Sequence, residues 1–275
     1  KTGEPVAVKR VIDRYANVPE IRQRAHQEAA LMFRHPNLVE MLGCCETSPN
    51  RGPLFIVSNF VQGENLDQFI NSHVRQLPNS ERRICELFFP VLDALSYIHQ
   101  KGIIHMDIKP SNIMMEQGKN VRLMDLGIAD VSETTNTATS GMMGTPKYAA
   151  PEQFSSTDTQ PQLTPATDIY EAGVTLYELL TCYNPFAVAT VAEARELHHE
   201  LLLEKKPSLS EAVYHVIRKA TAIDPAQRYQ SAAQMKMALK QALMAPPGPT
   251  PSSWLYALLA AIAVLIIVLL IIMLL

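Results

Sequence analysis

The 275-residue sequence is poor in cysteine and in charge. Four cysteines are too few for a disulfide-stabilised scaffold, and the 19% of charged residues leave a net charge of only −3. Because proteins that bind nucleic acid normally carry a clear basic excess, we expect no nucleic-acid partner. The hydrophobic content of 47% is high enough for a large core, which excludes general disorder.

Charge is missing altogether from the end of the chain, between Gln241 and Leu275. Residues 254–275 are all apolar and contain neither glycine nor proline. With a rise of about 1.5 Å per residue, a helix over this range is about as long as the hydrocarbon core of a bilayer is thick. We therefore predict one transmembrane helix at 254–275, after a proline-rich linker at 245–253.

The start of the chain lacks the basic and then apolar residues of a signal peptide. Together with the apolar tail, this predicts a single-pass membrane protein whose residues before the linker lie in the cytoplasm. The tail is either a terminal anchor or the passage to a segment outside the membrane, and the pattern leaves both open.

Strand-like segments lie early in the remaining sequence, and helical patterns dominate later. Strands are expected at 4–12, 38–44 and 54–61. Helices are expected at 20–33, 80–100, 168–182, 191–204, 208–222 and 231–243. In the first of these helices, Met32 falls on the packed face. This order predicts an α+β protein with a small β-rich lobe at 1–60 and a large helical lobe at 61–244.

An acid, a cation and an amide follow one another in a short proline-containing loop, at Asp107, Lys109 and Asn112. The apolar residues 103–104 before the loop indicate the end of a strand. A second apolar run ends in Asp125, as in a hairpin that presents Asn112 and Asp125 at its ends. Amide and carboxylate oxygens are ligands that hard divalent cations prefer, so this hairpin predicts a metal site. A lone acid before a glycine would more simply indicate a turn, but the matched spacing of both acids in one hairpin disfavours that interpretation.

Six short motifs occur in order along residues 1–243. They are Val6-Ala7-Val8-Lys9, the HMDIKPSN string at 105–112, Asp125-Leu126-Gly127, Ala150-Pro151-Glu152, Asp168–Gly173 and Asp224–Arg228. The first four resemble the VAIK, HRDxKPxN, DFG and APE motifs of the eukaryotic-type (Hanks-type) protein kinases, and the last two resemble later motifs of that family. The resemblance implies the two-lobed protein kinase fold. With the apolar tail, the chain is similar to bacterial membrane-anchored receptor-type kinases.

The resemblance implies ATP and Mg²⁺ as cofactors and gives each charged residue a role. Asp107 would accept or orient the proton of the attacking hydroxyl, and Lys109 would stabilise charge on the transferred phosphoryl group. Asn112 and Asp125 would hold the magnesium ions that bridge the ATP phosphates. Lys9 would contact the ATP phosphates and would need a helix carboxylate to fix its position.

The identity of that carboxylate is less clear from the sequence. Glu28 resembles the family's helix glutamate, yet it lies seven residues before His35, where the family pattern usually has nine. Counting nine leads to His26, which cannot serve as the acid. We favour Glu28, and Glu20 stays open as an alternative.

The adenine site and the substrate class follow from the same resemblance. Ala7 and Met114 would lie on either side of the adenine ring, and the segment from Asn59 to Val61 would form the hinge that binds it. Lys109, placed two residues after Asp107, is typical of kinases that act on serine and threonine in protein substrates.

Two further places in the sequence bear on the activity. The segment GTPKY at 144–148 resembles the peptide-positioning loop of the Ser/Thr kinases, with Thr145 bonded to the catalytic acid and lysine. Met106 replaces an arginine that commonly binds an activation phosphate, so we expect activity without that phosphate. Glu152 and Arg228 are expected to form a buried ion pair.

One expected motif is missing, because no glycine-rich loop precedes Lys9. We interpret the sequence as lacking the first strand and that loop through truncation at its start. The predicted function is a membrane-anchored, signalling protein Ser/Thr kinase. The alternative is a catalytically weak kinase-like binding module at the membrane, and a small-molecule phosphotransferase is disfavoured by GTPKY. The sequence leaves open whether two chains form a homodimer.

Overall fold

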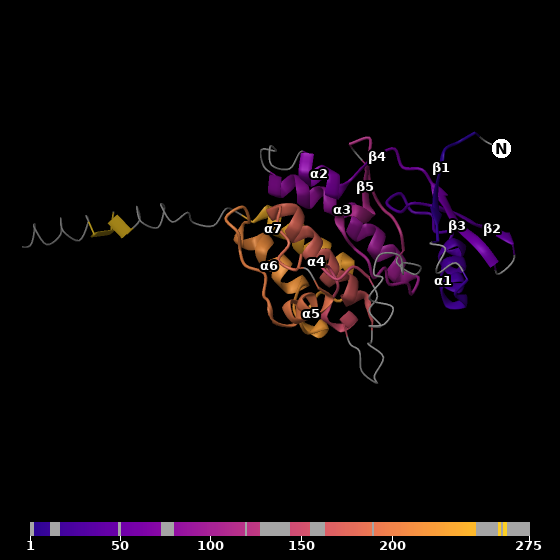
Figure 1. Ribbon diagram of the computed structural model, residues 1–275. Coiled ribbons are helices and arrows are strands. Elements are labelled where there is room, and N and C mark those ends of the chain that lie inside the picture. The colour runs from indigo at the N-terminus through magenta and orange to yellow at the C-terminus, as the bar shows by residue number, and fades with distance from the viewer. Residues whose placement is uncertain are drawn as a thin grey trace, which may run out of the picture.

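A computed structural model describes residues 3–11, 17–48, 51–72, 80–118, 120–126, 144–154, 163–188, 190–245, 258–259 and 261–262. A small sheet with one helix precedes a larger, mainly helical body, and the two lie side by side (Figure 1).

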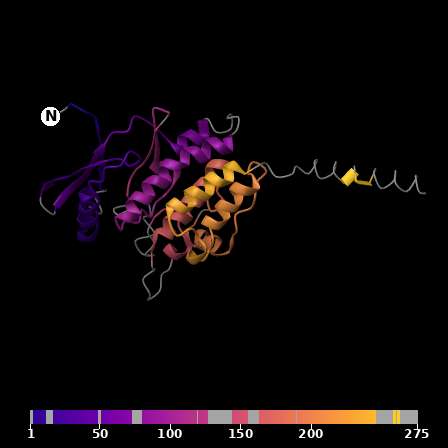
Figure 2. The same cartoon turned by 180° about the vertical axis from the view of Figure 1, so that it is seen from behind.

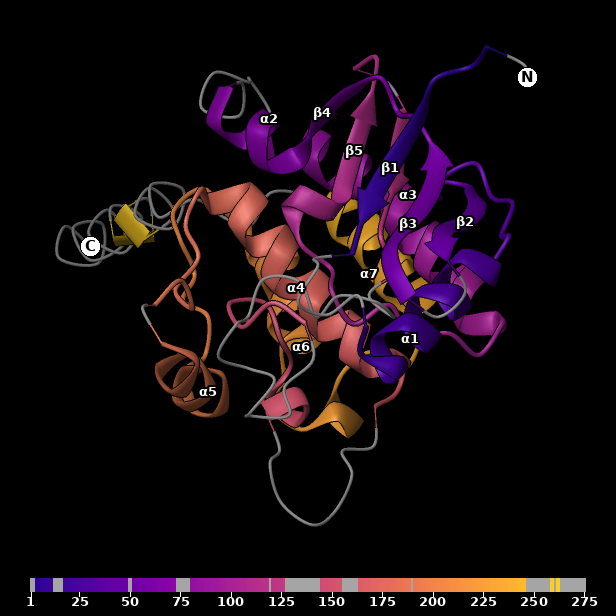
Figure 3. The same ribbon diagram turned by 45° about the vertical axis from the view of Figure 1, so that its right-hand side comes forward.

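The small lobe is an antiparallel sheet of three strands in the order β1-β3-β2. Its strands are β1 (Val6–Arg10), β2 (Met41–Ser48) and β3 (Arg51–Asn59). Helix α1 (Pro19–Ala30) lies against the sheet (Figure 3). Ala25 and Ala29 of the helix pack on Met41, Leu54 and Ile56, because small side chains let the helix approach the strands closely.

Strand β1 presents its two faces differently. Val6 and Val8 are exposed, whereas Ala7 and Lys9, on the opposite face, are partly covered. Successive side chains of a strand point to opposite faces, so Ala7 and Lys9 share one face. This is the face that the sequence assigns to ATP.

The described part of the large lobe is mainly helical. The helices are α2 (Leu66–Ser72), α3 (Ser80–Gln100), α4 (Pro165–Thr181), α5 (Val191–Glu200), α6 (Glu211–Ala220) and α7 (Ala232–Met244). Helix α3 packs against both α4 and α7, and α3 and α7 run side by side in the view from behind (Figure 2). Nearly every residue of α4 is buried, and a capping box at Thr164 fixes its start.

A second small sheet joins the two lobes. It consists of β4 (Gly63–Asn65), β5 (Ile113–Glu116) and β6 (Asn120–Leu123), in that order. The backbone N–H of Leu123 donates to Asn37 at 2.8 Å, and the carbonyl of Leu123 accepts from Val39 at 3.0 Å. The chain after α1 is thereby tied to the end of β6, directly before Asp125.

Most of the expected elements are confirmed, with shifted ends. The helix expected at 80–100 is α3, and β5 and β6 form the expected hairpin. The packed role of Met32 is wrong, because α1 ends at Ala30 and leaves Met32 65% exposed. The strand end expected at 103–104 is also wrong, since these residues form no strand. The short strand β4 was not foreseen.

The predicted span at 254–275 lies outside the described residues except for 258–259 and 261–262, which are helical. Among the described residues, no helix has the length and the apolar character that a bilayer crossing needs. The predicted linker lies outside them as well, apart from Ala245.

Candidate active site

The carboxylate of Asp107 is buried and holds three polar groups. The hydroxyl of Thr145 donates to Asp107 Oδ1 at 2.7 Å, and the amide of Asn112 donates to Asp107 Oδ2 at 2.7 Å. Lys109 Nζ lies 2.8 Å from the same Oδ2. The structure thus brings together four residues that the sequence proposed as a site, although Thr145 lies far from the others along the chain.

Thr145 links the acid and the cation. Lys109 Nζ donates to the Thr145 hydroxyl at 2.7 Å, while that hydroxyl donates to Asp107. Because the hydroxyl accepts from one group and donates to the other, its single proton is committed to the carboxylate. A hydroxyl at this position therefore fixes Asp107 and Lys109 relative to each other.

The loop that carries Asp107 is hydrogen-bonded through its backbone to Asp168, a buried acid of α4. Asp168 accepts from the backbone N–H of His105 and of Met106, both at 2.8 Å, and its Oδ2 lies 2.7 Å from His99 Nε2. Asp168 is fully buried, so these groups satisfy a carboxylate that water cannot reach. The start of the loop is thereby clamped to the core of the large lobe.

A second buried acid, Glu171, lies one helical turn further along α4. Its Oε2 accepts from the backbone N–H of Ile108 at 2.7 Å. Burial raises the pKa of Glu171 well above its ordinary value, and the carboxylates of Asp168 and Asp107 raise it further. The hydroxyl of Thr175, also on α4, donates to the carbonyl of Ile108 at 2.9 Å.

The segment with Thr145 approaches the loop so closely that only glycine fits before it. Gly144 has φ +91°, and a Cβ on it would lie 2.5 Å from the carbonyl oxygen of Met106. Met106 itself has φ 65°, a rare backbone conformation for a residue with a side chain. Gly144 and Met106, both with positive φ, therefore meet directly beside Asp107.

Asn112 precedes β5 and Asp125 follows β6, so both lie at the open end of the hairpin, where Ile113 pairs with Leu123. There the backbone N–H of Met124 donates to the carbonyl of Asn112 at 2.9 Å. The amide nitrogen of Asn112 is bonded to Asp107, which leaves its amide oxygen as the free acceptor. Asp125 Oδ2 lies 3.6 Å from Lys9 Nζ of β1. The small lobe thus contributes a cation to the site.

The sequence of residues 1–242 matches the family described as protein kinase domain. The chain belongs to the protein kinase family. It is 34% identical to the serine/threonine-protein kinase PrkC of Bacillus subtilis over 86% of this chain and 36% of the relative. It is equally similar to PknB of Mycolicibacterium smegmatis, at 34% identity over 84% of this chain and 37% of the relative. The kinase chain therefore spans little more than a third of these relatives.

The donor set of this kinase fits a magnesium ion. The described residues contain no cluster of three or more His, Cys, Asp or Glu that could enclose a metal. Two oxygen donors from the protein, at Asn112 and Asp125, suit an ion that keeps several waters and binds substrate phosphates. The site therefore resembles a phosphate-dependent magnesium site more than a cage made by protein alone.

Of the residues expected around adenine, Ala7 and Asn59 lie on the paired strands β1 and β3, whereas Met114 lies in the other sheet. Ala7 lies opposite Ser58 in the β1–β3 register, and Asn59 lies opposite Val6. Val61 is buried just after β3. Met114 belongs to the second sheet, where it lies opposite Asn65.

Glu28 is buried in α1, the helix that packs on β2 and β3. His26, the residue that the usual spacing selects, lies elsewhere: its Nδ1 is 3.1 Å from Cys44 Sγ, and its Nε2 is 3.5 Å from Glu46 Oε1. His26, which cannot serve as the acid, thus lies beside Cys44 and Glu46. Glu28 stays the candidate for the carboxylate that fixes Lys9.

The expected ion pair of the large lobe is present. Arg228 Nη1 and Nη2 donate to the two oxygens of Glu152 at 2.7 and 2.9 Å. Arg228 also donates to the carbonyls of Ala166, Ala222 and Ile223. This pair links the segment that carries Glu152 to the start of α4.

The sequence assigned no role to two residues that support the site, Glu171 and Gln153. Gln153 accepts from the backbone N–H of Ala150 and donates to the carbonyl of Met106. Glu171 falls within the Asp168–Gly173 motif, but the resemblance gave it no role, and Gln153 follows the Ala150–Glu152 motif directly. No spacing in the sequence distinguishes such a residue from one on a solvated face.

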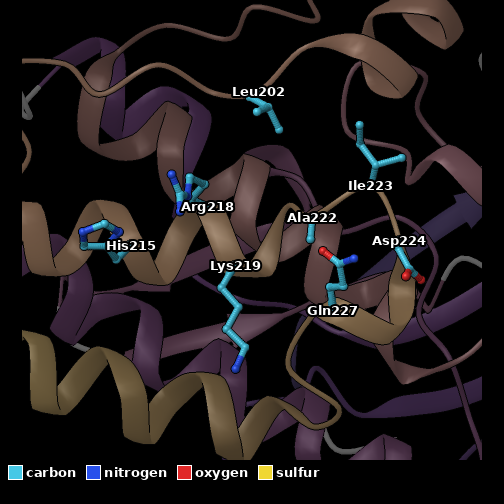
Figure 4. Close-up of a pocket in the computed structure, with 8 residues that line it drawn as sticks. All are labelled: Leu202, His215, Arg218, Lys219, Ala222, Ile223, Asp224 and Gln227. Atoms are coloured by element: carbon cyan, nitrogen blue, oxygen red, sulfur yellow. The ribbon is translucent and has the colours of Figure 1, made fainter.

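A separate hollow of about 480 Å³ lies on the large lobe, along α6 and the turn after it (Figure 4). It is lined by Leu202, His215, Arg218, Lys219, Ala222, Ile223, Asp224 and Gln227. None of these is a predicted site residue, so this hollow has no part in the site around Asp107.

Proposed function

We propose that the chain is the catalytic domain of an ATP-dependent protein serine/threonine kinase, with a small lobe at 1–60 and a large lobe at 61–244. The observation that supports this best is the shared hydrogen bonding of Asp107, Lys109, Thr145 and Asn112. A module that only binds partners has no chemical need for an acid, a cation and two hydrogen-bonding groups in one cluster.

In this proposal Asp107 receives the proton of a serine or threonine hydroxyl of the protein substrate. Thr145 and Asn112 hold the carboxylate in one orientation, so little reorganisation is needed when the hydroxyl attacks. Lys109 lies beside the carboxylate, where its charge stabilises the phosphoryl group as it moves from ATP to the substrate oxygen.

Asn112 and Asp125 would hold Mg²⁺, which, when bound, neutralises charge on the ATP phosphates. Lys9 would contact the phosphates from the small lobe, with Glu28 as the carboxylate that fixes it. Ala7, Met114 and the segment from Asn59 to Val61 would receive the adenine ring. The proximity of Lys9 and Asp125 supports this assignment, because it brings β1 to the end of the hairpin.

The test compares the full-length protein with its Asp107→Asn variant. Both are incubated with labelled ATP, Mg²⁺ and a basic protein. We expect the label to fall at least about 100-fold in the variant, because a general base is lost. Asp93→Asn is the matched control, since Asp93 pairs with Lys236 on α7 and is no part of the site. Equal labelling by the parent and Asp107→Asn would refute the proposal.

We further propose that residues 254–275 anchor this kinase in a membrane, with the kinase domain in the cytoplasm and a role in signalling. The apolar, uncharged sequence of this range supports the proposal. Flotation with phosphatidylcholine vesicles tests it. The chain should float with the vesicles, and a chain that lacks 254–275 should stay at the bottom. Equal flotation of both would refute anchoring by this segment.

A further inference from the structure

A hollow of about 340 Å³ lies directly beside Thr145, between the segment that follows Gly144 and the start of α5. Thr145 and Pro146 line one side, and Phe186 and Ala194 are among the residues that line the other. The wall formed by α5 and the turn before it is mostly apolar.

His198 connects the two walls from behind. It lies on α5 and is fully buried, with its ring stacked on Phe186 at a centroid distance of 3.7 Å and on Phe154 at 5.4 Å. Its Nε2 lies 3.0 Å from the carbonyl oxygen of Pro146, and its Nδ1 lies 2.8 Å from the hydroxyl of Tyr170. One imidazole on α5 therefore contacts both Tyr170 of α4 and Pro146 of the Thr145 segment.

The partners of the ring determine its protonation. A carbonyl oxygen can only accept, so Nε2 of His198 carries a proton and donates to Pro146. Burial lowers the pKa of His198 to about 3, so the ring is neutral and Nδ1 is a bare acceptor. The hydroxyl of Tyr170 supplies the matching donor. All polar atoms of the ring are satisfied in this one tautomer.

The hydrogen bond from His198 to Pro146 lies one residue away from Thr145, which belongs to the reactive cluster. Pro146 follows Thr145, whose hydroxyl bridges Asp107 and Lys109. Proline has a nearly fixed φ, so holding its carbonyl restricts the orientation of the peptide that leads to Thr145. Ala149, Phe154 and Ala194 pack together next to this bond, which keeps α5 against the segment.

We propose that His198 is a positioning residue for the transfer of phosphate to protein substrates. Its neutral imidazole donates to Pro146 and keeps the Thr145 hydroxyl between Asp107 and Lys109, with the adjoining hollow shaped for the substrate chain. This inference rests on the proposed kinase function. ATP binding does not depend on it, since Lys9 and Asp125 lie at the other lobe and at the β5–β6 hairpin.

Two substitutions separate the bond to Pro146 from the bond to Tyr170. In His198→Gln the side-chain nitrogen replaces Nε2 and can still donate to Pro146. In His198→Asn the shorter side chain can accept from Tyr170 but does not reach Pro146. The exposed neighbour His199 provides the matched control, His199→Asn. Initial rates at varied ATP and varied protein substrate give kcat and both KM values.

We expect His198→Asn to lower kcat/KM for the protein substrate at least about tenfold, because small displacements of positioning groups are costly, while the KM for ATP stays within about twofold. His198→Gln should restore most of the activity, and His199→Asn should match the parent. An inactive parent would contradict the proposed function itself. With an active parent, equal activity of the Asn and Gln variants, a parallel change in the KM for ATP, or a His198→Asn protein that no longer folds would overturn the positioning role.

Discussion

The ion pair between Arg228 and Glu152 offers a stability prediction that can be worked out from the structure. The side chain of Arg228 is fully buried, and that of Glu152 is 14% exposed. Arg228 also donates to three backbone carbonyls and lies over the ring of Tyr170 at 4.8 Å. Replacing it with methionine keeps much of the side-chain volume but removes every donor.

The Arg228→Met substitution leaves a largely buried carboxylate whose remaining side-chain donor is Thr167, at 2.9 Å. Breaking one side of a buried pair typically costs about 3–5 kcal/mol, and we expect a loss of that size. The three carbonyls left without their donor add to the loss, but these contributions are not additive. The free energy of unfolding would be measured by urea titration with circular dichroism.

The double variant Arg228→Met with Glu152→Gln tests the reason for the loss. If the unpaired charge dominates, removing it should return about 1–3 kcal/mol relative to Arg228→Met alone. A loss below about 1 kcal/mol in the single variant, or a double variant that loses the sum of both single effects, would refute the reasoning.

Further predictions concern the loop around Asp107 and the acid range. Gly144→Ala should abolish phosphate transfer while the protein stays folded, because its Cβ meets Met106; activity near the parent's would contradict the close approach. Met106→Arg should make basal activity depend on phosphorylation, which phosphatase treatment would reveal, whereas strict dependence in the parent would contradict the prediction. The pKa of His198 is about 3 in the folded protein and about 6.5 when unfolded. Between these pH values the unfolded state binds the extra proton, so stability should fall with falling pH, by at most about 1.4 kcal/mol per pH unit. Urea titrations should show that slope reduced in His198→Gln, and an unchanged slope would contradict it.

Much of the site could be predicted from the sequence because its residues are close together in one loop. Asp107, Lys109 and Asn112 lie within six residues, and a short turn is enough to bring them together. The contact with Thr145 came from resemblance, because no local rule joins residues so far apart in the chain. Glu28 could be proposed but not fixed, since the spacing to His35 departs from the family pattern.

The supporting residues could not be predicted, for a physical reason. Glu171 and His198 lie on helices, where polar residues usually face water. Their burial depends on partners in other segments, namely Ile108 for Glu171 and Pro146 and Tyr170 for His198. Such partners exist only after the helices have packed. For Met32 the sequence predicted burial wrongly, because the helical spacing of apolar residues continues past Ala30, where α1 ends.

The most direct test of the account is the rate of phosphate transfer to a serine-containing protein by Thr145→Ser and Thr145→Val variants. The account holds that one hydroxyl, shared by Asp107 and Lys109, completes the reactive cluster. It predicts that the serine variant keeps a rate close to that of the parent and that the valine variant loses at least about tenfold, with phosphoserine as the product. A valine variant as fast as the parent would contradict it.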